Sequence, residues 1–455
     1  MTDIGNSSAP AAARPSPAAI AASFSRRSVW ESWLEVEAAL AETQAELGMI
    51  PAEAAMEIRR KANFTVLDEA AMADDIERTK APIVSLVRAL SSACDGDAGG
   101  YVHWGATTQN VMQTGLALLM QRSHASLMDR FDDILASLAG LAERHAATVT
   151  VARTNLRQAL PITFGFKVAG WIEEWLRHRE RLDAAAPRVF RAQWGGAVGA
   201  MHAVGAQGPE LNRRLARRLG LGHFQVPSRA ALDCTAEYVL LLGLLAATSS
   251  KIARDLYVMM ADEYGEAAEA LGDDAVGSST MPHKVNPKVV VKVISVAARL
   301  RAQVPLALEA MQPTFEGDGA NNQMISALVQ ETCPLAYDLL VQMAALLDCL
   351  VIDERRMAEN LKRGGEFLAS ENVMMALAPI CGRTRAHDLV HHAVAEALKT
   401  GIPLADTLLD SGVLEGMVSE TTVREAADPS SYIGLSETIA LEMAAHARSI
   451  VRERA

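Results

Sequence analysis

Apolar residues recur at three- and four-residue steps along most of this chain. In "VMQTGLALLMQRSHASLMDRFDDILASLAGLAERHA", which begins at Val111, the repeat runs through Leu116, Leu119, Met120, Leu127, Phe131, Ile134, Leu138 and Leu141. Such spacing places one apolar stripe along a helix over many turns. A similar rhythm runs from Ala236 to Ala270, and it returns through Val289, Val293, Val296 and Leu300. We therefore predict long amphipathic helices.

Proline is absent from three long windows, which lie between Pro82 and Pro161, between Pro227 and Pro282, and between Pro334 and Pro379. The windows are rich in Ala, Leu, Met, Glu and Arg, which favour helices. Strand-like alternation is hardly seen, and aromatic residues make up only 5% of the chain. The fold class that follows is all-α, with helices long enough for a bundle that several subunits share.

Four regions follow from this pattern. Residues 1–20 are rich in Ala, Ser and Pro and lack the layout of a signal peptide, so we expect a flexible tail. Residues 21–112 are expected to form an N-terminal helical domain, and residues 113–365 a central long-helix domain that carries a catalytic loop. Gly364, Gly365 and Pro379 mark the start of a C-terminal helical domain, residues 366–455.

Composition narrows the function classes. A formal net charge of -12 argues against general nucleic-acid binding, but it leaves room for a local basic pocket that holds a small anion. No segment approaches about 18 uninterrupted apolar residues, so no membrane span is expected. Five scattered cysteines without a CxxC pair suggest neither a disulfide framework nor a zinc ribbon, and a reducing cytoplasm is the expected location.

Three polar stretches interrupt the helices: "HWGATTQN" from His103, "RTNLRQALP" from Arg153 and "GSSTMPHKVNP" from Gly277. In the third, serine hydroxyls lie a few residues before the Lys284 cation and the Asn286 amide, a set that can hold a carboxylate while a serine acts on the carbon beside it. Nearby cations and loop amides can stabilise the alkoxide that such a serine needs. A solvated connection between two helices is the alternative interpretation of this loop.

The sequence lacks the motifs of nucleotide triphosphatases and α/β-hydrolases, and it offers no clear metal site. A GxxxxGK[ST] phosphate loop and a GxSxG elbow are both absent. His391 and His392 point to different faces of a predicted helix, and Asp273 with Asp274 resembles a helix end more than a metal site, so we predict no metal. In "HWGATTQN", Thr107, Thr108 and Asn110 can bind a carboxylate or simply satisfy the first amides of a helix.

Taken together, the three stretches resemble the active-site regions of the aspartase/fumarase superfamily, in the same order and at the same spacing. "FSRRSVWESWLEVEAALAETQAELGMIP", "KAPIVSLVRAL", "ALPITFGFKVAGW", "GGAVGAMHAVG" and "GRTRAHDLV" resemble the branch that holds 3-carboxy-cis,cis-muconate cycloisomerase and adenylosuccinate lyase. The resemblance implies a homotetramer around a helix bundle, in which each active site takes its three regions from three subunits. It also implies chemistry without a cofactor, through a carbanion beside a carboxylate.

The resemblance also assigns roles by position. Ser278 is the implied base, and Lys284 with Asn286 would bind the activating carboxylate and its enediolate-like form. Thr107 and Thr108 would grip a substrate carboxylate, and flexibility at Gly277 would let the loop close. The catalytic residues are then Ser278 and Lys284, and the substrate-binding set is His103, Thr107, Thr108, Asn110, Thr154, Asn155, Arg157, Gln158, Ser279, Met281 and Asn286.

Several positions depart from the superfamily pattern. Asn155 stands where fumarases and adenylosuccinate lyases carry a histidine, and an amide cannot exchange a proton as imidazole does. "VPSRAALDCTAEY" and "FEGDGANNQM" replace elements that carry arginines in this branch, which leaves Leu232 and Gly317 at altered positions. We hypothesise that Arg157 or Arg229 supplies a relocated cation for a different distal group of the substrate.

The expected function is a lyase that performs anti β-elimination, or the reverse addition, at a C–N or C–O bond of a succinyl-type polycarboxylate and releases fumarate. Muconate-type cycloisomerisation and epimerisation beside a carboxylate remain alternatives that use the same carbanion. A catalytically silent structural protein, like the lens crystallins related to argininosuccinate lyase, is an alternative of another class. The expected partners are a small polycarboxylate and further copies of this chain.

Overall fold

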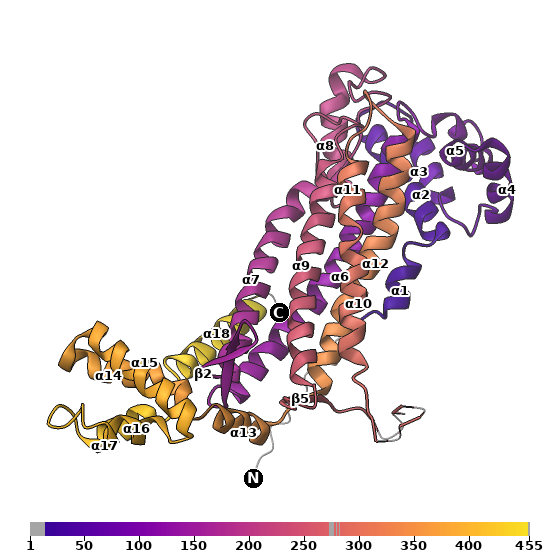
Figure 1. The fold of residues 1–455 in the computed structure, drawn as a ribbon. Coiled ribbons are helices and arrows are strands. Elements are labelled where there is room, and N and C mark those ends of the chain that lie inside the picture. The colour runs from indigo at the N-terminus through magenta and orange to yellow at the C-terminus, as the bar shows by residue number, and fades with distance from the viewer. Residues whose placement is uncertain (1–13, 273–276, 279, 282, 454–455) are drawn as a thin grey trace, which may run out of the picture. The chain divides into compact units, whose positions relative to one another are not determined.

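The computed structural model describes residues 14–453 except 273–276, 279 and 282. Figure 1 shows a chain built mainly from helices. Helices contain 68% of the residues, which confirms the all-α fold class. Its α-helices are α1 (Pro17–Ala22), α2 (Arg26–Glu46), α3 (Ala52–Lys61), α4 (Glu69–Thr79), α5 (Pro82–Ala93), α6 (Thr108–Arg144), α7 (Phe164–Val189), α8 (Gly208–Arg218), α9 (Asp233–Met259), α10 (Val289–Arg301), α11 (Val304–Ala310), α12 (Gly319–Cys349), α13 (Glu354–Gly364), α14 (Ser370–Cys381), α15 (Arg383–Thr400), α16 (Leu404–Asp410), α17 (Glu420–Ala427) and α18 (Ser436–Arg452).

The described residues also form short 3-10 helices and strands. They are η1 (Ala98–Tyr101), η2 (Gly205–Gln207), η3 (Gly365–Ala369), β1 (Val149–Thr154), β2 (Arg157–Thr163), β3 (Arg191–Ala192), β4 (Gly222–His223), β5 (Ala267–Glu269) and β6 (Leu350–Ile352). The strands pair two by two: β1 with β2 and β5 with β6 antiparallel, and β3 with β4 parallel. The β1–β2 hairpin lies in "TVARTNLRQALPIT", where the sequence pattern had indicated no strand.

The long helices predicted from the apolar periodicity are present. α6 runs for 37 residues and α12 for 31. Proline marks their ends less well than expected, because Pro334 lies inside α12 and Pro379 inside α14. The helix expected from Ala236 to Ala270 ends earlier: α9 stops at Met259, and the chain then turns at Gly265, whose φ of 61° lies in the left-handed region, before entering β5.

Contacts group the chain into two compact units. The first unit contains residues up to 131, residues 178–247 and residues 295–341, and the second contains residues 132–177, 248–294 and 342–455. Fully buried side chains such as Trp194 and Tyr337 lie in the first unit. In the second unit the C-terminal helices have an apolar cluster of their own, which runs from Val373 to Ala427. The four-region division made from the sequence stays a prediction.

The predicted flexible tail is wrong for the described residues 14–20. Ser16 caps the first helix, because its hydroxyl accepts a hydrogen bond from the backbone N–H of Ala19, and Pro17 fills the first turn. Ile20 is only 6% exposed. The carbonyl oxygen of Pro15 also accepts a hydrogen bond of 2.7 Å from the Tyr337 hydroxyl. This segment is therefore part of the first unit.

One helix of the described residues, α9, is long and apolar enough to cross a membrane, and 61% of its most apolar window is buried within the structure. The five cysteines are free thiols. His391 and His392 lie exposed on α15, as a helix surface requires, whereas Asp273 and Asp274 lie outside the described residues.

Candidate active site

The first polar stretch leads directly into α6. The Asn110 side chain is 1% exposed, and its Oδ1 accepts hydrogen bonds of 3.1 Å from the backbone N–H groups of Thr107 and Gly196. Asn110 therefore fixes the backbone beside Thr107. Thr107 and Thr108 remain partly exposed at the start of the helix, where the helix dipole favours a bound anion. The direct substrate contacts expected of these residues stay predictions.

His103 is held by a carboxylate that the sequence had not singled out. Its Nδ1 lies 2.6 Å from Oε1 of Glu37, which is 1% exposed. In the tautomer that donates from Nδ1 to this carboxylate, Nε2 is the ring atom left to face another group. Glu37 occupies the buried face of α2, one turn from Trp33 and Leu34. A carboxylate on an apolar helix face was the signal that could have revealed it.

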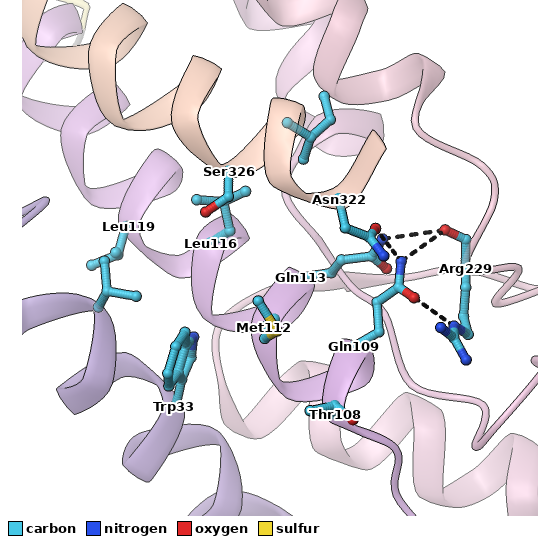
Figure 2. A pocket seen from close by; sticks show the side chains of 12 residues that line it. Trp33, Thr108, Gln109, Met112, Gln113, Leu116, Leu119, Arg229, Asn322 and Ser326 are labelled. Atoms are coloured by element: carbon cyan, nitrogen blue, oxygen red, sulfur yellow. Dashed lines mark hydrogen bonds between the residues drawn. The ribbon is translucent and has the colours of Figure 1, made fainter. Parts of the chain in front are cut away.

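A cavity of about 230 Å³ opens beside Thr108 in the first unit, and Figure 2 shows its lining. Its walls come from α2, α6, α12 and the segment before α9, and their residues are Val29, Trp33, Thr108, Gln109, Met112, Gln113, Leu116, Leu119, Arg229, Asn322, Ile325 and Ser326. The polar members Gln109, Gln113, Asn322 and Arg229 gather together, away from Trp33 and Leu119 (Figure 2). The cavity therefore has a hydrogen-bonding end and an apolar end.

Arg229 is anchored at the polar end. Its Nε donates to Oε1 of Gln109 over 2.6 Å, and its Nη1 donates to the carbonyl oxygen of Ala197 over 2.6 Å. Gln109 in turn donates to Asn322. A Cβ at Gly317 would lie 2.9 Å from Nη2 of Arg229, so glycine at that position makes room for the guanidinium. Gly317 and Arg229 both lie in segments where the sequence departs from the pattern of the branch that it resembles.

The second polar stretch is the tip of the β1–β2 hairpin in the second unit. Arg153 pairs with Gln158 and Thr154 with Arg157, which leaves Asn155 and Leu156 as a two-residue turn. Both turn residues have positive φ, 51° and 62°. Asn tolerates this conformation, whereas Leu does so at a cost, and turns of this kind suit the twist of a hairpin. Thr154, Asn155, Arg157 and Gln158 are exposed.

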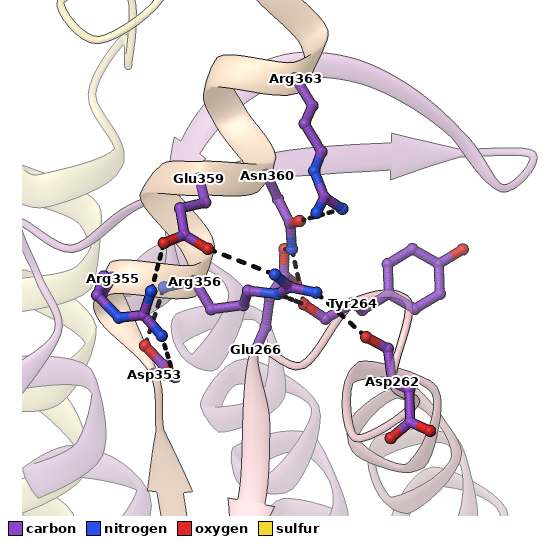
Figure 3. A network of polar contacts seen from close by, with 9 residues as sticks. All are labelled: Asp262, Tyr264, Glu266, Asp353, Arg355, Arg356, Glu359, Asn360 and Arg363. Atoms are coloured by element: carbon purple, nitrogen blue, oxygen red, sulfur yellow. Dashed lines mark hydrogen bonds and ion pairs between the residues drawn. The ribbon is translucent and has the colours of Figure 1, made fainter.

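Buried polar contacts hold the base of this hairpin. The Arg153 guanidinium binds Glu266 through both Nη atoms, over 2.8 and 2.6 Å, and it lies 4.7 Å from the Tyr264 ring centre. Glu266 is fully buried and also accepts a hydrogen bond of 2.8 Å from Asn360 on α13. Figure 3 shows Tyr264, Glu266 and Asn360 among the polar groups at α13. Glu266 and Asn360 are further residues that the sequence pattern missed.

The third polar stretch places two amide donors on the Ser278 oxygen. The backbone N–H groups of Thr280 and Met281 donate to its Oγ over 3.3 and 3.2 Å. The Ser278 N–H donates to the carbonyl oxygen of Lys284 over 2.9 Å, which folds the loop back on itself. The side chains of Met281, Lys284 and Asn286 are exposed, and Ser279 lies outside the described residues. Donors aimed at a serine oxygen stabilise its ionised form.

The three groups of predicted residues thus fall into two sets. His103, Thr107, Thr108 and Asn110 lie together in the first unit, and the hairpin residues and the Ser278 loop lie in the second. Of the two arginines considered for a relocated cation, Arg229 lines a cavity and Arg157 is exposed on the hairpin. Among the described residues, no three His, Cys, Asp or Glu side chains are grouped to hold a metal ion.

Comparison with known proteins identifies the class. A family model described as "Lyase" matches residues 15–301, and one described as "Adenylosuccinate lyase C-terminus" matches residues 366–443. The chain belongs to this lyase family, the aspartase/fumarase superfamily, and to its branch of adenylosuccinate lyases and 3-carboxy-cis,cis-muconate cycloisomerases. It is therefore an enzyme.

Individual relatives cover nearly the whole chain. An N-acetyl-S-(2-succino)cysteine lyase of Enterococcus italicus is 34% identical over 88% of this chain and 88% of its own. An adenylosuccinate lyase of Methanothermobacter thermautotrophicus is 36% identical over 90% of this chain and 93% of its own. Among solved structures, a fumarate lyase from a Mesorhizobium species shares 33% identity with a TM-score of 0.87, and covers 94% of this chain and 97% of its own. A 3-carboxy-cis,cis-muconate lactonizing enzyme from Pseudomonas putida shares 29% identity with a TM-score of 0.86, over 96% and 98%.

Proposed function

We propose that this enzyme catalyses anti β-elimination, or the reverse addition, at a C–N or C–O bond of a succinyl-type polycarboxylate, and that the elimination releases fumarate. The observation that carries the proposal is the pair of backbone N–H groups on the Ser278 oxygen. A serine is a poor base at neutral pH unless its alkoxide is stabilised, and two donors at 3.3 and 3.2 Å do so. The name of the succinocysteine lyase adds a C–S bond to the bonds worth testing.

The proposed reaction has two steps. Ser278 first gives its hydroxyl proton to solvent. Its alkoxide then takes the proton from the carbon beside a carboxylate, and the electron pair of that C–H bond moves into the carboxylate as an enediolate-like dianion. Lys284 and Asn286 hold this group, so their contacts strengthen as charge develops. The electron pair then returns to form the C=C bond while the bond to the leaving group breaks. Asn155 cannot protonate that group, which favours one that departs without help from an imidazole acid.

We further propose that the cavity beside Thr108 receives the part of the substrate that departs. Thr108 would bind a carboxylate at its edge, the Gln109–Arg229–Asn322 group would bind a hydrogen-bond acceptor, and the apolar end would hold a short alkyl or aryl group. Arg229 is the one cation among the described lining residues, and its Nε and Nη1 already bind Gln109 and Ala197. A phosphate dianion fits such a wall poorly, which disfavours a nucleotide substrate.

A screen of fumarate against a panel of amines and thiols, with products detected by mass, tests the reaction and the cavity together. We expect addition products with short apolar amines or thiols and none with adenosine monophosphate. Leu116→Trp should suppress the longer members of the panel and spare the shortest. Arg229→Ala should weaken substrates that carry an acceptor at the distal end, and unchanged affinity in both Arg229→Ala and Arg157→Ala would exclude a relocated cation.

Ser278→Ala tests the base. Loss of one positioned base typically costs roughly 100-fold to 10,000-fold in rate, and a surface hydroxyl is not needed for folding. We expect turnover to fall by that range while circular dichroism and subunit assembly match the parent protein. Thr280→Ala removes the neighbouring hydroxyl but keeps both backbone donors, so it is the matched control and should retain most activity. An active Ser278→Ala variant refutes the assignment.

Muconate-type cycloisomerisation is the second candidate function. Asn155 favours it, because ring closure or opening releases no fragment that needs an acid at this position. A 3-carboxy-cis,cis-muconate cycloisomerase of Pseudomonas aeruginosa is 34% identical over 90% of each chain. Disappearance of the muconate absorbance would support this reaction, and entry of solvent deuterium into an unbroken substrate would support epimerisation.

We also propose a cytoplasmic homotetramer that acts without a cofactor. Membership of an enzyme family makes a catalytically silent role the least supported of the alternatives.

A further inference from the structure

Two carboxylates at a short strand of the second unit bind the segments next to its two polar stretches. β5 spans Ala267–Glu269, directly after the buried Glu266. Glu266 binds the hairpin through Arg153, as described above. Glu269, three residues further on, begins the connection that carries Ser278 and leads to α10. The residue before β5 therefore binds the hairpin, and the last residue of β5 begins the connection that carries Ser278.

Glu269 closes the Ser278 loop by binding its far end. Its two carboxylate oxygens accept hydrogen bonds from the backbone N–H groups of Lys288 at 2.6 Å, Val289 at 3.0 Å and Val290 at 2.7 Å. These amides belong to the start of α10, where unpaired donors and the helix dipole favour a negative charge. Glu269, which precedes the loop, thus binds the residues that follow it, and this contact holds the two ends of the loop together.

Glu266 and Asn360 hold the hairpin on both of its strands. Arg153 and Gln158 are cross-strand partners on either side of the Asn155–Leu156 turn. Arg153 binds Glu266, and Nε2 of Gln158 donates to the carbonyl oxygen of Asn360 over 3.3 Å. Asn360 itself donates to Glu266 over 2.8 Å. Both strands are therefore clamped just below the turn, and the exposed Thr154 and Asn155 project beyond the clamp.

Pairing with β6 makes β5 a rigid support for the two carboxylates. Ala267 pairs with Ile352 and Glu269 with Leu350 in the antiparallel ladder. The backbone N–H of Asp353, which caps α13, donates to the carbonyl oxygen of Glu266 over 3.0 Å. Arg356 on α13 adds a hydrogen bond of 2.9 Å to the Tyr264 carbonyl oxygen (Figure 3). Strand β6 and helix α13 thus hold β5 and the adjoining Glu266 in place.

We propose that Glu266 and Glu269 are positioning residues: Glu266 sets the place of the hairpin that carries Thr154, Asn155 and Gln158, and Glu269 sets the place of the loop that carries Ser278 and Lys284. This inference rests on the proposed function for the roles of Ser278 and Lys284, and on the predicted substrate-binding set for Thr154, Asn155 and Gln158. Catalysis requires reacting groups to be held to within a fraction of an ångström, and groups that support them act by limiting their motion. The two carboxylates should therefore affect different kinetic constants.

The experiment compares Glu266→Gln and Glu269→Gln with Glu359→Gln. Glu359 is a carboxylate of the same polar network, and its ion pairs among the described residues are with Arg355 and Arg356. With a fumarate and amine pair that the parent enzyme couples, Glu269→Gln should lower kcat at least tenfold and change KM by less than threefold. Glu266→Gln should raise KM at least tenfold with a smaller change in kcat, and the control should change neither.

Hydrogen exchange followed by mass spectrometry supplies a readout that does not depend on the reaction. Peptides covering Lys288 to Val290 should lose protection in Glu269→Gln, and peptides covering the hairpin should lose it in Glu266→Gln. Because Glu266→Gln leaves a buried cation unpaired, its folded fraction can fall. The double variant Arg153→Met with Glu266→Gln removes that charge and should still show the raised KM.

Two results would overturn the proposal. The first is exchange in both segments that matches the parent protein. The second is altered exchange with kcat and KM per folded enzyme unchanged, which would mean that the contacts stabilise the fold alone. Failure of the proposed function looks different: the parent enzyme would turn over no pair in the panel, or Ser278→Ala would stay active. The exchange result then decides alone whether the two carboxylates position the two segments.

Discussion

His145 is a histidine whose pKa is lowered in the folded protein. Burial lowers its pKa below the usual value of 6.5, and the neighbouring Glu354 only partly opposes this effect. Its Nδ1 lies 3.1 Å from both Oγ1 of Thr148 and Oε1 of Glu354. Because the folded pKa lies below the unfolded one, the contribution to stability is complete above about pH 6.5 and is lost as the pH falls through the unfolded pKa toward the folded one.

His145→Asn should therefore flatten part of the acid dependence of stability. Asn keeps a polar atom near the place of Nδ1 but does not take up a proton. We expect the parent protein to be the more stable of the two at pH 7.5 and the difference to shrink at pH 5, measured as denaturant midpoints. His387→Asn is the control, because that ring is exposed. A difference that grows toward pH 5 would mean that protonated His145 is favoured by Glu354 instead.

Single residues also show what the sequence could and could not reveal about the site. Ser278, Lys284 and Asn286 stood out because Gly, Pro and polar residues crowd together between apolar repeats. Glu37 is marked only by its place on the apolar face of α2, and Glu266 by nothing in its stretch, and the partners that they hold, His103 and Arg153, lie more than 60 residues away. Tertiary contacts set pairs at that separation, so the local sequence pattern does not reveal which residues pair.

Helix α6 illustrates how much of an element a pattern predicts. Its bounds, Thr108–Arg144, follow the apolar stripe that begins near Val111. The β1–β2 hairpin was missed because its second strand alternates poorly and Leu156, which has a positive φ, does not mark a turn as Gly would. The helix at Pro17–Ala22 was missed because Ala and Pro suggested disorder, although Ser16 and Pro17 form a cap signal.

Two glycines of α6 should respond in opposite ways to alanine. A Cβ at Gly115 would lie 2.6 Å from Oγ of Ser32 and 2.9 Å from Cδ1 of Trp33, so α2 can approach only because Gly115 has no side chain. Gly115→Ala should cost about 2 kcal/mol of unfolding free energy. A Cβ at Gly140 would meet only the flexible ends of Arg144 and Arg448, at 3.3 and 3.8 Å. Gly140→Ala should therefore stabilise by up to about 1 kcal/mol.

Urea unfolding of both variants, followed by circular dichroism, measures these effects. The two substitutions introduce the same methyl group into the same helix, so helix propensity cancels between them and the contacts at each position remain. Equal stabilisation by both would show that α2 and α6 can separate slightly at no cost. Because Trp33 lines the cavity beside Thr108, Gly115→Ala should also change its shape, and Gly140→Ala should not.

The proposed homotetramer, with active sites shared between subunits, predicts complementation between inactive variants. If each active site takes its three segments from three subunits, two inactive variants with damage in different segments should restore activity when mixed. In such mixed tetramers some sites receive an intact "HWGATTQN" segment from one chain and an intact Ser278 loop from another. Thr108→Val and Ser278→Ala are suitable parents, because the first change lies in the first unit and the second in the second unit.

We expect light scattering to give about four times the 48.7 kDa of one chain for each parent. After the variants are dissociated and reassembled together, turnover should rise well above that of either parent alone. Ser278→Ala mixed with Lys284→Ala is the matched control: both changes lie in one loop, so every site built from these chains contains a damaged loop and turnover should stay low. Complementation in the control as well would mean that reassembly itself, and not shared sites, restores activity. No gain in the test mixture would confine each active site to a single chain.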